Sequence, residues 1–186
     1  MPVSRGLPDM PLKQRVDGER IYLATLDPEN LSSDYLRWMK DPEVLRFLAN
    51  PEADYSLQSL REFVRCANAD LYERLLGIFV KEGGRHIGNI KIGNIHPKHG
   101  FADVGIIIGE KALWGQGFAT EAIRLAVHHV FHDLHLHKLT AWILAINTGS
   151  YKAFLKAGFK DAGCFRKHAL LDGKYYDSHL VEIIND

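Results

Sequence analysis

Residues 113–122 read Leu113-Trp114-Gly115-Gln116-Gly117-Phe118-Ala119-Thr120-Glu121-Ala122, a glycine-rich turn that opens a long helical pattern. An apolar run at residues 104–108 precedes it, so the order is strand, short loop, turn and helix. At such a turn, consecutive backbone N–H groups face outward together, and the helix N-terminus adds a partial positive charge. Glycines let a ligand approach the backbone closely because they carry no side chain. The stretch therefore favours a phosphate-binding site.

Two familiar phosphate-binding motifs do not fit this turn. A dinucleotide-binding turn needs three glycines at fixed spacing, directly at the end of the strand. Here Thr120 stands where the third glycine would fall, and a loop separates the turn from the strand. A P-loop continues with lysine and then serine or threonine after its glycines, and that continuation is absent. Two interpretations remain open, another kind of phosphate site and an ordinary helix start that contains two glycines.

The hydrophobic pattern of the other segments predicts both strands and helices. We expect strands at residues 20–26, 75–81, 85–95, 101–108, 138–146, 159–170 and 174–184, and helices at 31–39, 43–48, 57–74, from the glycine turn to about 134, and at 148–157. Residues 104–108 are apolar at every side-chain position, which indicates burial on both faces. The expected fold is α/β (α+β), with a mixed, mostly antiparallel, twisted sheet of about seven strands flanked by helices.

Length and composition indicate one ordinary domain. Residues 1–18 are rich in proline and polar residues and predict a flexible arm, and residues 19–186 predict a single domain. The 23 Lys and Arg residues balance 23 Asp and Glu residues, so nothing favours nucleic acid. No apolar stretch has membrane-spanning or signal-peptide character, and Cys66 and Cys164 lie far apart. We expect a cytoplasmic protein without a membrane partner; its oligomeric state stays open, with a homodimer as one option.

The surroundings of the turn narrow its interpretation. Residues 85–159 resemble the GCN5-related N-acetyltransferases (GNAT), which move an acetyl group from acetyl-CoA to an amine. The matching pieces are the strand that ends in Ile107-Ile108-Gly109, the turn itself, and the later segment with Asn147, Ser150, Lys152-Ala153-Phe154 and Lys156-Ala157-Gly158-Phe159. Trp114 stands where most of the family has Gln or Arg, and this resembles the RimJ/RimL branch. That branch acetylates protein N-termini and includes relatives that act on amino sugars and other small amines.

The resemblance implies a set of residues that bind acetyl-CoA. Backbone groups of the strand end would face the pantetheine arm, amides of the turn would hold the pyrophosphate, and Asn147 would reach the arm from across an open gap in the sheet. Lys152 would lie near the nucleotide phosphates, although a solvated helix lysine is an equal alternative. The implied cofactor-binding residues are Ile107, Ile108, Gly109, Gly115, Gln116, Gly117, Phe118, Ala119, Thr120, Asn147 and Lys152.

Acyl transfer needs a neutral amine, donors for the oxyanion and a proton for the thiolate leaving group. Many family members supply that proton from a Tyr where this chain has Phe154, which has no proton to donate. By resemblance to the RimJ/RimL branch, Ser150 would take this role, and Tyr151 is a second candidate. The alternative is that Ser150 only caps a helix.

The sequence is less informative about a general base. Some relatives use a Glu where this chain has Trp142, so that role does not carry over. Asp103, flanked by apolar residues, is our candidate because partial burial would raise its pKa; His96 and His99 lie near it in sequence. An ordinary exposed Asp, or a base relayed through water, remains an alternative.

Five histidines gather after the turn helix, at 128, 129, 132, 135 and 137. His128 and His132 are one helical turn apart, a spacing that suits metal ligation. No Glu follows His128 as in metalloproteases, and a helix end is a natural place for exposed histidines. We therefore expect no metal site.

Two functions remain from the sequence. The first is an N-acetyltransferase that moves an acetyl group from acetyl-CoA to a primary amine of a small molecule or peptide. The second is a non-catalytic acyl-CoA-binding or regulatory module on the same fold, which Phe154 and Trp142 keep open. The helices within 31–74 would form one wall of the acceptor pocket, with Tyr35, Trp38, Phe47 and Tyr55 as lining or core aromatics. The acceptor itself is not evident from the sequence.

Overall fold

The computed structural model describes residues 14–48 and 55–185. Within these ranges the strands form an eight-stranded sheet in the order β1-β2-β3-β4-β5-β6-β8-β7. Only β5 and β6 pair in parallel, so the expected mixed, mostly antiparallel sheet is confirmed. The strands are β1 (Arg15–Asp17), β2 (Ile21–Thr25), β3 (Arg74–Val80), β4 (His86–His96), β5 (Phe101–Ile108), β6 (Lys138–Leu144), β7 (Lys160–Leu171) and β8 (Lys174–Ile184).

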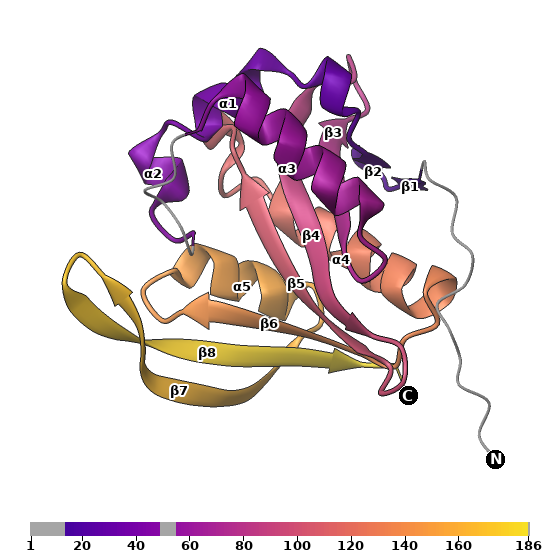
Figure 1. Cartoon of the computed structure of the whole chain (residues 1–186). Helices are drawn as coiled ribbons and strands as arrows, with labels where there is room; N and C mark the ends of the chain where they lie inside the picture. The colour runs from indigo at the N-terminus through magenta and orange to yellow at the C-terminus, as the bar shows by residue number, and fades with distance from the viewer. Residues whose placement is uncertain (1–13, 49–54, 186) are drawn as a thin grey trace.

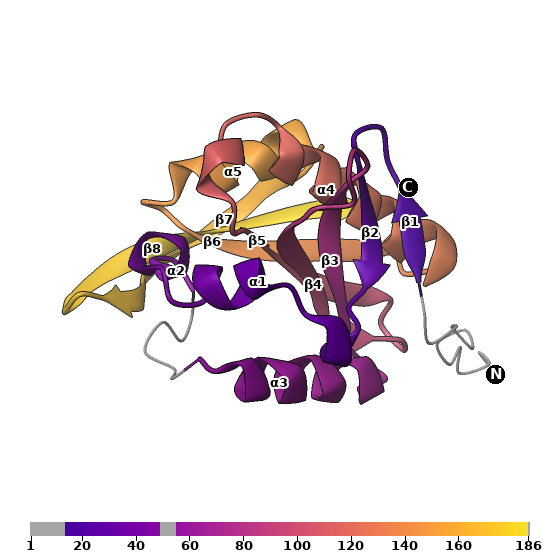
Figure 2. The same cartoon turned by 90° about the horizontal axis from the view of Figure 1, so that it is seen from above.

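Helices cover both faces of the sheet (Figures 1 and 2). They are α1 (Ser33–Trp38), α2 (Pro42–Leu45), α3 (Leu57–Ala69), α4 (Phe118–His128), which continues as a π-helical turn (His129–Asp133), and α5 (Thr148–Lys156). Seen from above, α1 and α3 lie on one side of the sheet, and α4 and α5 lie on the other (Figure 2). Two clusters of buried side chains match these two layers, one under each set of helices. No described helix is long and apolar enough to cross a membrane.

Local sequence signals explain where α3 begins and ends. Ser56 and Ser59 form a reciprocal capping box at its N-terminus, and Leu60, Val64 and Ala67 make its buried stripe. The helix ends at Ala69, five residues before the expected end. The reason is a turn in which the Asp70 carboxylate accepts the Tyr72 N–H at 2.6 Å, after which the chain enters β3.

The N-terminal segment differs from the expected arm in one respect. Residues 15–17 pair with β2 as strand β1, which raises the strand number from the expected seven to eight. Edge strands of three residues leave almost no periodic signal in a sequence. Residues 1–13 of the expected arm lie outside the described residues.

The feature that positions the site is the divergence of β5 and β6. They pair only from Phe101–Asp103 to Lys138–Thr140, and beyond that point β6 stays paired with β8 as far as Leu144. The second half of β5 is therefore left without a neighbour on this side. The expected burial of residues 104–108 on both faces is wrong, since Gly105 is exposed and Ile106 to Ile108 are half-buried.

Close packing joins α1 to the end of β5. Trp38 is 1% exposed, in the cluster between α1, α3 and the sheet. Its indole lies against Gly109, and a Cβ added to that glycine would stand 2.0 Å from Trp38 Cδ2. Gly109 is thus the residue that lets α1 approach the strand that borders the gap.

Candidate active site

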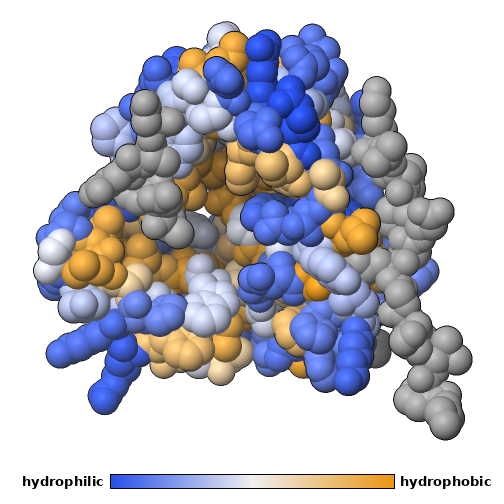
Figure 3. Space-filling model, in the orientation of Figure 1, coloured by the Kyte–Doolittle hydropathy of each residue, from blue (hydrophilic) through white to orange (hydrophobic). Residues whose placement is uncertain are grey.

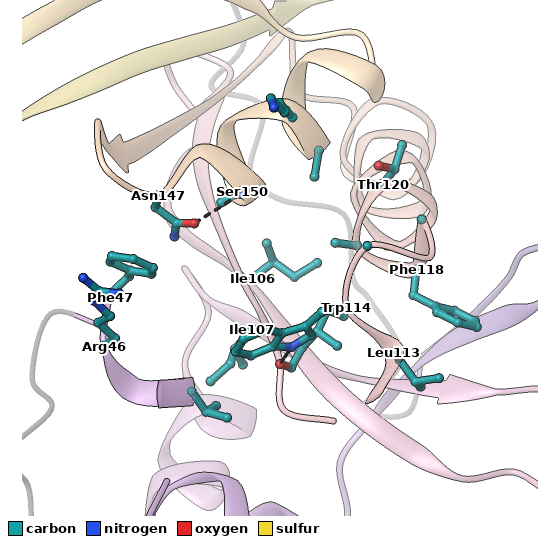
Figure 4. A pocket seen from close by; sticks show the side chains of 18 of the residues that line it. Arg46, Phe47, Ile106, Ile107, Leu113, Trp114, Phe118, Thr120, Asn147 and Ser150 are labelled. Atoms are coloured by element: carbon teal, nitrogen blue, oxygen red, sulfur yellow. Dashed lines mark hydrogen bonds between the residues drawn. The ribbon is translucent and has the colours of Figure 1, made fainter. Parts of the chain in front are cut away.

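A cavity of about 500 Å³ opens where β5 and β6 part. In the space-filling view it is a hollow with apolar walls at the centre of the face (Figure 3). Its walls come from α2, the second half of β5, the glycine turn and α5 (Figure 4). The lining residues are Glu43, Val44, Arg46, Phe47, Leu48, Ile106, Ile107, Ile108, Leu113, Trp114, Gly115, Gly117, Phe118, Ala119, Thr120, Asn147, Gly149, Ser150, Lys152, Ala153 and Lys156.

The glycine turn presents a helix N-terminus to this cavity. Gly115 and Gly117 have φ values of 75° and 85°, in the left-handed region that favours glycine. Gly117 is the N-cap of α4, and no side chain there caps the first N–H groups of the helix. These groups belong to Phe118, Ala119 and Thr120, which all line the cavity. Uncapped N–H groups and the helix dipole make this end suited to an anion.

Arg20 braces the turn from outside the cavity. Its guanidinium donates to the Gln116 carbonyl at 3.0 Å and to the Glu121 carboxylate at 2.9 Å, and it lies over the Phe118 ring. The other oxygen of Glu121 accepts the backbone N–H groups of Arg20 at 2.7 Å and of Ile21 at 3.2 Å. The first turn of α4 is thereby tied to β2.

This brace predicts a pH dependence of stability. Burial raises the pKa of Glu121, but the hydrogen bonds from Arg20 and Ile21 outweigh it and hold that pKa below its ordinary value. A lowered folded-state pKa stabilises the protein above the unfolded pKa of about 4.3, and that stabilisation is lost as the pH falls through the folded value. Urea unfolding of wild type and Glu121→Gln should therefore differ most above about pH 5. A difference that stays constant down to pH 3 would contradict the assignment.

The positive φ at Gly115 leads to a second prediction. Nothing lies within 4 Å of a Cβ added there, so Gly115→Ala should cost only the left-handed strain, about 1 kcal/mol. Gly173→Ala, in the β7–β8 turn, carries the same strain far from the cavity and is the matched control. Both variants should lose similar stability in thermal unfolding, but only Gly115→Ala should weaken acetyl-CoA binding, by about 10-fold or more. Equal affinities in titration would exclude the turn from the phosphate site.

Of the three residues expected to present backbone groups to the cavity, Ile107, Ile108 and Gly109, only Ile108 does so. The Gly109 N–H donates to the Ile87 carbonyl of β4 at 2.9 Å, and strand alternation then directs the backbone of Ile107 toward β4 as well. Gly109 does not line the cavity, and Ile107 contributes its side chain. Backbone groups of Ile106 and Ile108 face the gap instead, and the Ile108 carbonyl accepts the Trp114 indole N–H at 2.7 Å.

Gln116 is also placed differently from the expectation. It does not line the cavity, because its side chain turns back and donates to the Ala112 carbonyl at 2.7 Å. Its backbone carbonyl receives the Arg20 guanidinium. Gln116 therefore shapes the turn and leaves the contact with the cavity to its neighbours.

The N-terminus of α5 forms the wall opposite β5. Asn147 is its N-cap, and its Oδ1 accepts the Ser150 N–H at 3.2 Å (Figure 4). Asn147 thus keeps its amide N–H₂ for the cavity, and the capping role that was an alternative for Ser150 belongs to Asn147. Ser150 and Lys152 line the cavity, and so does Lys156, one turn further along α5, which the sequence had not indicated.

Tyr151, the second candidate acid, points elsewhere. Its hydroxyl donates to the Asp161 carboxylate and its ring stacks on His179 at 4.4 Å. The hydrogen bond to Asp161 and burial raise the pKa of Tyr151, and the residue does not line the cavity. Phe154 is 2% exposed and packs edge-on against Phe159 in the core.

The candidate base Asp103 also lies away from the cavity. It sits where β5 and β6 still pair, and its carboxylate accepts the Thr140 hydroxyl and the Asn94 amide. His96 and His99 both stack on Phe101 at the same end of the sheet, and their own rings are tilted against each other. The structure thus does not bring these residues to Ser150.

The histidines after α4 have other contacts. His128 and His132 stack at 4.2 Å, and His129 is 1% exposed with its Nδ1 2.7 Å from Asp133. In the part of the chain that the structure describes, no group of three or more potential ligands is arranged to hold a metal ion.

The part of residues 31–74 that lines the cavity is α2 and the residues directly after it. Of the four aromatics considered, Phe47 lines the cavity, whereas Tyr35 and Trp38 are core and Tyr55 packs against that core. Lys111, which precedes the glycine turn, holds α2 in place through Asp41 at 2.7 Å and Glu43 at 2.9 Å. No local spacing signals such a tertiary contact, so the structure was needed to show that Arg46 and Leu48 also belong to this wall.

Comparison with known proteins agrees with this geometry. The model of a family described as "Acetyltransferase (GNAT) domain" matches residues 20–160. The probable N-acetyltransferase YjcK of Bacillus subtilis is 36% identical over 110 residues, which cover 59% of this chain and 60% of that protein. The ribosomal-protein-serine acetyltransferase of Escherichia coli is 27% identical over 115 residues, 62% of this chain and 63% of that protein. The chain thus aligns with about six tenths of the length of these two relatives.

A solved structure shows the same fold over nearly the whole chain. It is the spermidine N-acetyltransferase of Vibrio cholerae in complex with CoA and spermine. The TM-score is 0.79 at 22% identity, and the match covers 89% of this chain and 95% of that one.

Proposed function

This chain belongs to the acetyltransferase (GNAT) domain family, and from that premise we propose that it transfers an acetyl group from acetyl-CoA to a primary amine. Its relatives include ribosomal-protein acetyltransferases, as the resemblance to the RimJ/RimL branch implies. One observation carries the proposal. The uncapped N-terminus of α4, the unpaired edge of β5 and the start of α5 all line one cavity.

Each wall then has a role toward acetyl-CoA. The N–H groups at the start of α4 hold the pyrophosphate, and Lys152 and Lys156 lie on the same cavity, where they attract the remaining phosphate charge. Backbone groups of Ile106 and Ile108 and the Asn147 amide flank the pantetheine arm. These groups are suited to a long, flexible ligand with an anionic end and an amide-bearing arm.

The reaction is a direct attack on the thioester. The amine nitrogen bonds to the carbonyl carbon, the C–S bond then breaks, and the sulfur leaves with its electron pair. The Ser150 hydroxyl gives its proton to the thiolate and recovers one from the amine through water. Because the thioester is already reactive, positioning of the two substrates supplies much of the rate.

The printed names of relatives suggest two kinds of acceptor, a ribosomal protein and a polyamine. We take a primary amine as the shared chemistry. Both cysteines, Cys66 and Cys164, are free thiols at the surface, and this suits a reducing compartment such as the cytoplasm.

The second candidate is a module that binds acyl-CoA without turnover. Phe154 in place of the usual Tyr favours it, since that side chain has no proton to give. Titration with acetyl-CoA in thermal unfolding, followed by thiol release with a panel of amines, separates the two. Stabilisation and thiol release with an amine are expected. Stabilisation without release on any amine would favour the module, and no stabilisation by any CoA species would contradict both.

A further inference from the structure

Positive side chains outnumber negative ones on the walls of the cavity. Four charged residues line it, Glu43, Arg46, Lys152 and Lys156. The single carboxylate among them, Glu43, is engaged by the Lys111 ammonium at 2.9 Å. The other three are cations, so the cavity attracts anions and disfavours additional positive charge.

Arg46 differs from the cations around it. Arg37 is paired with Asp34 at 3.0 Å and with Glu110 at 3.2 Å, and Lys111 with two carboxylates of the α2 region. No ion pair joins Arg46 to any carboxylate of residues 14–48 and 55–185. Its guanidinium lies 5.2 Å from the centroid of the half-buried Phe47 ring. A guanidinium over a ring is well placed to take an anion in bidentate fashion.

The position of Arg46 separates it from the phosphate end of the cavity. Arg46 and Phe47 lie on the side of Asn147, whereas Phe118 and Thr120 lie across the cavity at the start of α4 (Figure 4). Lys152 and Lys156 line the cavity one helical turn apart on α5, and the Lys156 carbonyl accepts the Arg124 guanidinium of α4 at 2.7 Å, which ties this end of α5 to α4. Ser150, beside Asn147, marks where the thioester would lie if the proposed function holds. Of the three cations that line the cavity, Arg46 is then the one assigned to the acceptor.

We propose that the acceptor is a primary amine that also carries an anionic group, a carboxylate or a phosphate, which Arg46 binds while the apolar part rests on Phe47. This inference rests on the proposed function. A polyamine is the opposite case, because its several positive charges would meet the three cations of the cavity.

Pairing with Arg46 also helps the amine to lose its proton. An anion close to an ammonium group favours the charged form, and pairing that anion with a guanidinium offsets this effect. Within the described residues, the cavity has no carboxylate other than the engaged Glu43 to act as a base. Binding through Arg46 thus raises the neutral, reactive fraction of the amine without a dedicated base.

The test uses pairs of acceptors that differ in the anion. Thiol release is measured with phenylalanine against phenylalaninamide, with phosphoethanolamine against ethanolamine, and with spermidine, and rates are compared per neutral amine. The first pair probes a carboxylate and the second a phosphate. We expect kcat/KM to be about 10-fold or more higher for at least one anionic member than for its neutral twin, since charge-assisted hydrogen bonds are worth at least that factor.

Variants of Arg46 test whether this side chain causes the preference for anionic acceptors. Arg46→Glu should reverse the preference, and Arg46→Lys should keep part of it. Arg85→Glu, at an exposed position in the β3–β4 turn, is the control that alters charge without touching the cavity. Stabilisation by acetyl-CoA should change much less than the acceptor preference, because the uncapped start of α4 and both lysines of α5 remain in place.

Three results would overturn the inference. Equal rates within both pairs, faster turnover of spermidine, or an unchanged preference in Arg46→Glu would each exclude Arg46 as the anion site while leaving an acetyltransferase. If no amine gives thiol release, the proposed function itself fails, and this inference with it. The two failures are therefore distinguishable in the same assay.

Discussion

Replacing Ser150 with alanine should lower kcat by about 100-fold or more, as expected for loss of a general acid. Ser150 is half-buried in the wall formed by the start of α5, and its N–H is already held by Asn147. The helix cap therefore does not need the hydroxyl, and its loss removes a proton donor without disturbing the wall. Steady-state thiol release gives kcat, and titration with acetyl-CoA should give an affinity within about 2-fold of wild type.

Tyr151→Phe is the matched control for this experiment. Its hydroxyl is bound to Asp161 outside the cavity, so kcat should stay near the wild-type value. Ser150→Cys keeps a group that can donate a proton and should recover part of the loss. If Ser150→Ala turns over at the wild-type rate, or if Tyr151→Phe loses activity instead, Ser150 is not the acid.

Replacing Gly109 with alanine should destabilise the protein by about 3 kcal/mol or more, the upper range for overpacking a core. The new Cβ would stand 2.0 Å from Trp38 Cδ2 and 2.3 Å from Cγ, closer than any relaxed contact. Trp38 is 1% exposed, so α1 has to move away from β5. In a domain of this size, the midpoint of thermal unfolding should fall by about 6–12 °C.

Gly105→Ala provides the comparison on the same strand. A Cβ at Gly105 meets nothing within 4 Å, so its stability should equal or slightly exceed that of wild type. Urea and thermal unfolding of the two variants measure this difference in stability. Equal stabilities for Gly105→Ala and Gly109→Ala would mean that Trp38 does not constrain this position.

Features that depend on neighbouring residues in the sequence were predictable. The strand–turn–helix order around Gly115 and Gly117 was visible because its glycines and helical period lie within a few residues of one another. Asn147 and Ser150 were found through the resemblance to the GNAT family, whose motif has them three residues apart, and the cap role of Asn147 became visible only in the structure. The strand ranges followed from apolar runs separated by turn residues.

Features that depend on distant contacts were not predictable. An apolar run at residues 104–108 has the same pattern whether protein or a ligand covers it, so the divergence of β5 from β6 was implied by the family resemblance and not by the run itself. Asp103 is close to this run in sequence, yet it lies where the strands still pair. Arg46 joins the cavity through a tertiary arrangement in which Lys111, far along the chain, pairs with Asp41 and Glu43 of the α2 region.

The brace at Arg20 has a consequence for experiments on divided chains. Arg20 and Glu121 are 101 positions apart, and Gly83-Gly84 lies between them in an exposed turn. A cut at that turn would place the α4 N-terminus on one fragment and its brace on the other. Recovery of CoA affinity on mixing would then report that β2 has returned to its place beside α4, so the ligand itself would measure reassembly of the two fragments.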